Sequence, residues 1–266
     1  MLASTLGQLE TQFFAYIQGH KRLSVETGEL IHALGLTPSQ ERKLLSRLSR
    51  KGLITRVRRG LYLVPPHLPA GGRWSPGEFL ALQTLIADRN GTYQICGPNA
   101  FYRYGWIDQI PNRIYAYNDR ISGERKIGRV SLTLIKVATE RLGATEVVKT
   151  PDGISVVYAS KPRALMDAVY DWARFNTLPQ AYGWIRAEIA IDDTLAAQLI
   201  NVSLRYGNQG TLRRLGKLLD IAGVQASLLR KLAKALRPSS SLIPWVPTLP
   251  KQGKADQRWG IVVNDA

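Results

Sequence analysis

The feature that most constrains the fold is a helix start at Thr37-Pro38-Ser39-Gln40. Thr37 can act as the N-cap, and Pro38 fills the first helical position, where no backbone N–H is needed. Gln40 stands at the third position and completes a capping box with Thr37. Gly52 is placed to end the helix in the left-handed conformation. The pattern therefore predicts a helix from about residue 38 to residue 51.

The segments on both sides of this helix complete a recognisable unit. Apolar residues at three- and four-residue spacing predict a helix over 5–18, and Ser24 can cap a second helix over 25–34. Two alternating runs, 53–58 and 61–64, are joined at Arg59-Gly60 and predict a hairpin. Three helices followed by a basic hairpin are typical of a winged helix-turn-helix, whose third helix enters the major groove of DNA.

The charge of the chain favours the same partner. Its 266 residues include 36 Lys and Arg against 20 Asp and Glu, a net charge of +16. Such an excess favours a polyanion, most often nucleic acid. Gln40 and Arg42 lie near the helix start and could reach base edges, whereas the other cations suit phosphates. The predicted DNA-binding residues are Ser39, Gln40, Arg42, Lys43, Ser46, Arg47, Arg50, Arg56, Arg58 and Arg59. The alternative is a solvated basic surface on a winged helix that binds protein.

The remaining chain predicts a second, larger domain, so the fold class is α+β. A linker rich in Pro and Gly over 67–73 separates the winged helix, 1–66, from residues 74–266. Strand signals dominate 93–160, and helical periodicity dominates 161–237. A Pro-rich tail, 238–266, ends in an apolar run that predicts a returning strand.

Several classes of function are disfavoured by what the sequence lacks. It contains no Walker loop, dinucleotide fingerprint or nucleophile elbow, so we predict no catalytic residue and no cofactor. One cysteine, Cys96, and three histidines cannot build a structural zinc cluster, and we predict no metal. The sequence contains no run of 18 apolar residues, so we predict no membrane-spanning helix. A lone thiol and no secretory signal favour a cytoplasmic protein.

Two groups of charged residues outside the winged helix each have a functional and a purely structural interpretation. Asp152 and Asp167 could serve a metal-dependent nuclease, but a Pro-Asp-Gly turn and a solvated helix edge with Asp171 are the simpler interpretations. A basic stripe near the C-terminus could contact a toxin or nucleic acid, or could be an ordinary charged helix face. Its members are Arg205, Arg213, Arg214 and Lys217.

The order of several motifs resembles the AbiEi antitoxins of bacterial abortive-infection (type IV) toxin–antitoxin systems. The matching stretches, spread over nearly the whole chain, are 51–62, 97–101 with 109–111, 160–167, 206–208 with 213–216, and 258–261. The resemblance implies a winged helix that binds operator DNA and represses its own operon. It also implies a C-terminal region that counteracts a nucleotidyltransferase-like toxin, directly or indirectly, and it carries over no catalytic residue. The alternative function is a ligand-responsive winged-helix regulator without a toxin partner.

Overall fold

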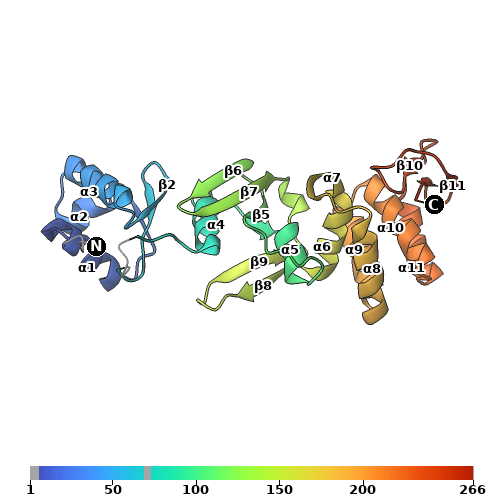
Figure 1. Cartoon of the computed structure of the whole chain (residues 1–266), viewed down its shortest axis with the longest axis horizontal. Helices are drawn as coiled ribbons and strands as arrows, with labels where there is room; N and C mark the ends of the chain where they lie inside the picture. The colour runs from blue at the N-terminus through green and yellow to red at the C-terminus, as the bar shows by residue number, and fades with distance from the viewer. Residues whose placement is uncertain (1–5, 69–72, 266) are drawn as a thin grey trace.

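The computed structural model describes residues 6–68 and 73–265. Figure 1 shows three parts in series along the longest axis: an N-terminal lobe, a central sheet and a helical lobe that holds the C-terminus. The N-terminal lobe contains helices and a small sheet, the central part is mainly a sheet, and the C-terminal lobe is mainly helical. The predicted α+β class is therefore confirmed. Residues 69–72 of the predicted linker lie outside the described residues.

The N-terminal lobe is a winged helix. Its elements are α1 (Gln8–Gly19), β1 (Ser24–Glu26), α2 (Glu29–Leu34), α3 (Pro38–Arg50), β2 (Thr55–Arg58) and β3 (Leu61–Leu63). The strands form an antiparallel sheet in the order β1-β3-β2. Phe13, Ile17, Leu44 and Leu48 are fully or almost fully buried between the helices and the sheet.

The predicted start of α3 is confirmed in detail. The Thr37 hydroxyl accepts a hydrogen bond from the Gln40 backbone N–H, and the Gln40 side chain accepts one from the Thr37 backbone N–H. Gly52 adopts a φ of 73° just after the helix, in the left-handed region that favours glycine.

The predicted second helix begins later than the sequence indicated. Residues 24–26 form β1, in which Val25 lies opposite Tyr62 of β3, and α2 begins only at Glu29. Gly28, with a φ of 110°, separates the two elements. The expectation of a helix from residue 25 was wrong because a three-residue strand carries too short an alternation to be told from a helix cap.

The central part is a six-stranded sheet with the order β6-β7-β5-β4-β9-β8. Its strands are β4 (Tyr93–Ile95), β5 (Ile114–Asn118), β6 (Gly123–Ile127), β7 (Val130–Lys136), β8 (Thr145–Lys149) and β9 (Ser155–Ala159). The helices of this part are α4 (Glu78–Ala87), which packs on the sheet, α5 (Pro98–Arg103), and the short 3-10 helix η1 (Thr139–Arg141). Sequence patterns predict five strands in this part, over 93–96, 114–118, 131–137, 145–149 and 154–159. All five are found, and β6 is an addition.

The C-terminal lobe packs its helices around a large apolar core. The helices are α6 (Lys161–Tyr170), α7 (Trp172–Phe175), α8 (Gln180–Ile191), α9 (Leu195–Tyr206), α10 (Gln209–Ile221) and α11 (Ala226–Ala235). The tail adds β10 (Ile243–Pro244), β11 (Lys254–Asp256) and β12 (Ile261–Val263), and β12 confirms the predicted returning strand. Within the described residues, no helix has the length and apolar character needed to span a membrane.

The wing of the N-terminal lobe is shared with the central part. Leu63 is buried in the core of the central sheet, while its neighbour Val64 is buried in the winged-helix core. Val57 of β2 also packs against the central core. Trp74 donates its backbone N–H to the Gly52 carbonyl at 2.8 Å. The winged helix is therefore held against the sheet by apolar packing as well as by the chain connection.

Candidate nucleic-acid interface

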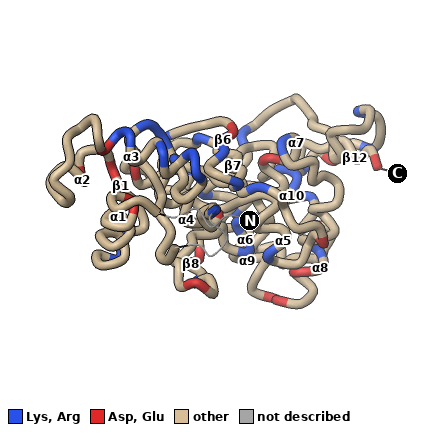
Figure 2. The backbone as a smooth tube through the Cα atoms, turned by 60° about the vertical axis from the view of Figure 1, so that its left-hand side comes forward, with Lys and Arg blue, Asp and Glu red and all other residues tan. Residues whose placement is uncertain are grey.

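Helix α3 presents one apolar face and one cationic face. Leu44, Leu45 and Leu48 are buried against the lobe, so the opposite side of the helix faces solvent. All seven α3 residues predicted to bind DNA are exposed: Ser39, Gln40, Arg42, Lys43, Ser46, Arg47 and Arg50. Figure 2 shows basic positions along this helix.

Glu41, the one acidic residue of α3, is turned into the lobe. Its carboxylate accepts hydrogen bonds from the backbone N–H of Gly28 at 2.9 and 2.8 Å and from that of Leu30 at 2.9 Å. These N–H groups belong to the start of α2, where a carboxylate is favoured. Because Glu41 is fully buried, the solvent-facing side of α3 carries no negative side chain. The sequence pattern alone did not indicate this role of Glu41.

A second buried acid, Glu10 of α1, engages one of the predicted contact residues. It accepts from Lys51 Nζ at 2.9 Å and from Arg47 Nε at 2.9 Å. Burial alone would raise the pKa of Glu10, but the hydrogen bonds from Lys51 and Gly7 and the charge of Arg47 hold that pKa below its ordinary value. Part of the Arg47 charge is thus already neutralised.

The predicted contact residues differ in whether their side chains already bind another group of the protein. Gln40 uses its side-chain oxygen in the capping box, and Arg42 donates Nε to the Pro38 carbonyl at 3.1 Å. Six others make no side-chain hydrogen bond or ion pair with any residue in the described part of the chain: Ser39, Lys43, Ser46, Arg50, Arg56 and Arg59. Gln40 would have to leave its cap to contact adenine with both its oxygen and its nitrogen.

The wing carries its two strand arginines on one face. In β2, Arg56 and Arg58 are exposed while Val57 between them is partly buried. The turn at Arg59-Gly60 is fixed by the residue that follows β1, because Thr27 donates its backbone N–H to the Gly60 carbonyl at 2.8 Å. Gly60 has a φ of 85°, as the tight turn requires.

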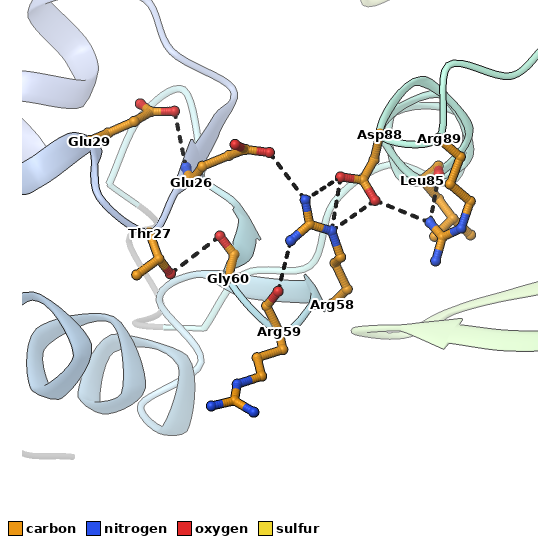
Figure 3. Close-up of polar contacts among 9 residues, drawn as sticks. All are labelled: Glu26, Thr27, Glu29, Arg58, Arg59, Gly60, Leu85, Asp88 and Arg89. Atoms are coloured by element: carbon orange, nitrogen blue, oxygen red, sulfur yellow. Dashed lines mark hydrogen bonds and ion pairs between the residues drawn. The ribbon is translucent and has the colours of Figure 1, made fainter.

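Arg58 is bound within the protein rather than free for phosphate. Its Nε donates to both carboxylate oxygens of Asp88, at 2.9 and 2.8 Å, just after α4 (Figure 3). Its other nitrogens contact Glu26 at 3.3 Å and the Arg59 carbonyl at 2.8 Å. The hydrogen bonds from Arg58 lower the pKa of Asp88. The Arg58 charge thus already has a partner in Asp88, although the side chain stays 40% exposed, and its contact with DNA stays a prediction.

The β6–β7 hairpin adds cations that were not among the predicted contact residues. Arg125, Lys126 and Arg129 are exposed on this hairpin, and Figure 2 shows basic positions there too. The hairpin lies beside the wing: a Cβ on Gly128 would lie 3.1 Å from Thr55 of β2. The usable signal was the charged stretch 124–129, which contains Gly128 at its turn.

The predicted basic stripe near the C-terminus does not form. Arg213 and Arg214 are only 8% and 7% exposed, because the tail covers this side of α10. They donate to the carbonyls of Ser241 at 2.8 Å and Pro244 at 3.2 Å. Lys217 pairs with Asp256 at 2.9 Å, and Arg205 alone of the four is exposed, on α9.

Asp152 and Asp167, the two candidate carboxylates for a nuclease, lie in different environments. Asp167 is fully buried and paired with Arg163 at 2.8 Å and Arg141 at 3.2 Å, so the interpretation as a solvated helix edge was wrong. Asp152 is exposed in the turn between β8 and β9, where Thr150 donates to it. The structure does not bring the two carboxylates into one site.

Fold and surface together define a winged-helix protein with a cationic third helix. Residues 25–65, from β1 to just beyond β3, match the family described as "Transcriptional regulator, AbiEi antitoxin". The predicted resemblance to AbiEi antitoxins is therefore confirmed over this region, which contains α3 and the wing.

The whole chain shares its fold with a solved structure. The crystal structure of the RV2827C protein from Mycobacterium tuberculosis superposes with a TM-score of 0.60 at 14% identity, over 97% of this chain and 92% of that chain. At this identity the likeness concerns the fold alone. No curated protein matches this chain in sequence.

Proposed function

We propose that this protein is an antitoxin that binds operator DNA and represses its own operon, and that it acts as a regulator rather than an enzyme. The observation that carries the proposal is the α3 surface, on which every predicted contact residue is exposed while both nearby acids, Glu10 and Glu41, face inward. The match of residues 25–65 to AbiEi antitoxin regulators supports the same function.

In this proposal α3 enters the major groove, and the flanking cations contact phosphates. The freest charges, those of Lys43, Arg50, Arg56 and Arg59, replace counterions on the backbone. The β6–β7 hairpin, with Arg125 and Lys126, would extend the contact beyond the wing. Gln40 and Arg42 are the candidates for base contacts, because they lie near the N-terminal end of α3.

The test compares two triple variants that remove the same charge. Lys43→Gln/Arg50→Gln/Arg59→Gln alters the proposed interface, and Arg230→Gln/Lys231→Gln/Lys234→Gln alters exposed positions on α11. Fluorescence anisotropy with duplex DNA from upstream of the gene, at several salt concentrations, measures affinity and salt slope. The first variant should lose about tenfold or more in affinity and up to about 2.7 units of slope. Equal losses in both variants would contradict the proposed interface.

We further propose that the protein counteracts a nucleotidyltransferase-like toxin, by direct contact or indirectly. The support is the antitoxin family match alone. Expression of the neighbouring nucleotidyltransferase-like gene, with and without this protein, tests it: growth should be lost with the toxin alone and restored by co-expression. If no such neighbour is toxic and a small molecule changes DNA affinity, the ligand-responsive regulator is the better assignment.

A further inference from the structure

One face of α10 carries three charged residues that point at the C-terminal tail. Lys217 pairs with Asp256, and Asp220 accepts hydrogen bonds from Arg258 at 2.9 Å and from the Trp259 indole at 2.8 Å. Arg213, one turn earlier, has no carboxylate partner among the described residues. It donates instead to the Ser241 carbonyl at 2.8 Å.

The buried position of Arg213 is unfavourable for the stability of the fold. Arg213 is 8% exposed, and a buried charge without an opposite charge is unfavourable unless other polar groups compensate it. Its guanidinium also lies directly against the backbone of Gly260, where a Cβ would come within 3.2 Å of it. Gly260 has a φ of 63°, so both its conformation and its lack of a side chain make room for the arginine.

Arg213 lines a cavity that contains further cations. The cavity has a volume of about 270 Å³ and lies between α10, the end of α11 and the tail. Arg237 and Arg258 line it as well, together with Ser239, while no aspartate or glutamate belongs to the lining. Arg258 is partly neutralised by Asp220 from outside the cavity, whereas the exposed Arg237 side chain makes no ion pair within the described chain.

We propose that this cavity is an anion site that binds a phosphate group of a small phosphate ester. Guanidinium groups present paired N–H donors that match phosphate oxygens, and the Ser239 hydroxyl adds another donor. The volume lies below the usual range for drug-sized ligands, which fits inorganic phosphate or a sugar phosphate better than a full nucleotide. The bound dianion would supply the charge partner that Arg213 lacks. Figure 1 places the tail and α3 at opposite ends of the molecule, so this site is separate from the proposed DNA interface.

The experiment titrates the full-length protein with inorganic phosphate and with ribose 5-phosphate by isothermal calorimetry. Chloride at matched ionic strength and ribose without phosphate are the reference ligands. We expect saturable binding of both phosphates and none of the references. Arg237→Gln should weaken phosphate binding about tenfold, because it removes one charge-assisted contact from an exposed side chain that the fold does not need.

Two further measurements separate a phosphate site from a general effect of surface charge. Lys231→Gln on α11 removes an equal, exposed charge outside the cavity and should leave phosphate binding unchanged. Arg237→Gln should also leave the affinity for duplex DNA unchanged. Phosphate that acts no differently from chloride, or binding that both variants weaken equally, would overturn the site. A loss of DNA affinity in Arg237→Gln without saturable phosphate binding would instead make this surface a nucleic-acid contact.

Discussion

Arg58 on the wing and Asp88 just after α4 are joined by a two-pronged ion pair, in which the Arg58 Nε lies 2.9 and 2.8 Å from the two Asp88 oxygens. The Asp88 side chain is only 6% exposed, whereas that of Arg58 is 40% exposed. The pair therefore fixes the direction of the wing relative to the central sheet. It also leaves Arg59, and not Arg58, as the wing arginine of the two whose charge has no internal partner in the described chain.

Arg58→Ala and Arg59→Ala should consequently differ in their effect on DNA binding. The Arg59 side chain makes no hydrogen bond or ion pair within the described chain, so its loss should flatten the plot of log affinity against log salt by about 0.9 unit. Arg58 is already neutralised by Asp88, so Arg58→Ala should change the slope far less while lowering stability. Anisotropy titrations at four salt concentrations measure both slopes. Equal flattening by both variants would mean that Arg58 leaves Asp88 when DNA binds.

The same pair should make stability depend on pH. Hydrogen bonding to Arg58 lowers the pKa of Asp88 in the folded protein below the value of about 3.9 in the unfolded chain. A depressed carboxyl pKa contributes stability that is fully present above the unfolded pKa and disappears as pH falls through the folded pKa. Asp88→Asn should cost about 1 to 2 kcal/mol at pH 7. The difference between the two proteins in urea unfolding should shrink below about pH 4. A difference that stays constant down to pH 2.5 would contradict the ion pair.

Glu41 should matter for stability rather than for DNA contact. It satisfies two backbone N–H groups at the start of α2, so Glu41→Ala leaves buried donors without partners and should cost about 2 to 3 kcal/mol. Glu26→Ala, at a side chain that is 55% exposed, is the matched control and should cost less than about 1 kcal/mol. Urea unfolding compares the two. Similar losses would show that the inward carboxylate of Glu41 contributes no more than a surface acid.

Gly216 should tolerate no side chain. An added Cβ would lie 2.1 Å from the ring of Trp259, a fully buried tail residue that packs against α10. Gly216→Ala should therefore destabilise the protein by about 1 to 3 kcal/mol and shift the tryptophan emission as the ring moves. Gly183 in α8 has open space around it, so Gly183→Ala should instead stabilise by about 0.5 to 1 kcal/mol. Thermal unfolding followed by fluorescence distinguishes these opposite signs.

Local signals predicted the winged helix well. The capping box at Thr37 and Gln40 and the turn at Arg59-Gly60 depend on neighbours within a few residues, and both are found where the pattern placed them. The strand β6 was missed because four of its five residues are exposed, and so it shows no apolar alternation. Its charges are visible in the sequence, but its position beside the wing is not.

Side chains whose partners lie far along the chain were the least predictable. Asp167 pairs with Arg141, and Arg213 is covered by residue 241 and its neighbours in the tail. Helical periodicity identifies which positions share a face, but it cannot reveal which distant segment packs on that face. For the same reason the internal partner of Arg58 could not be foreseen from a basic hairpin alone.

Leu63 and Val64 are neighbours in sequence, yet they are buried in two different hydrophobic cores. A fragment that stopped near residue 68 would leave Leu63 and Val57 facing water and would lose Asp88 as the anchor of Arg58. The N-terminal lobe is therefore not a portable module: its transplantation onto another protein would require a substitute apolar surface and a substitute acid for the wing.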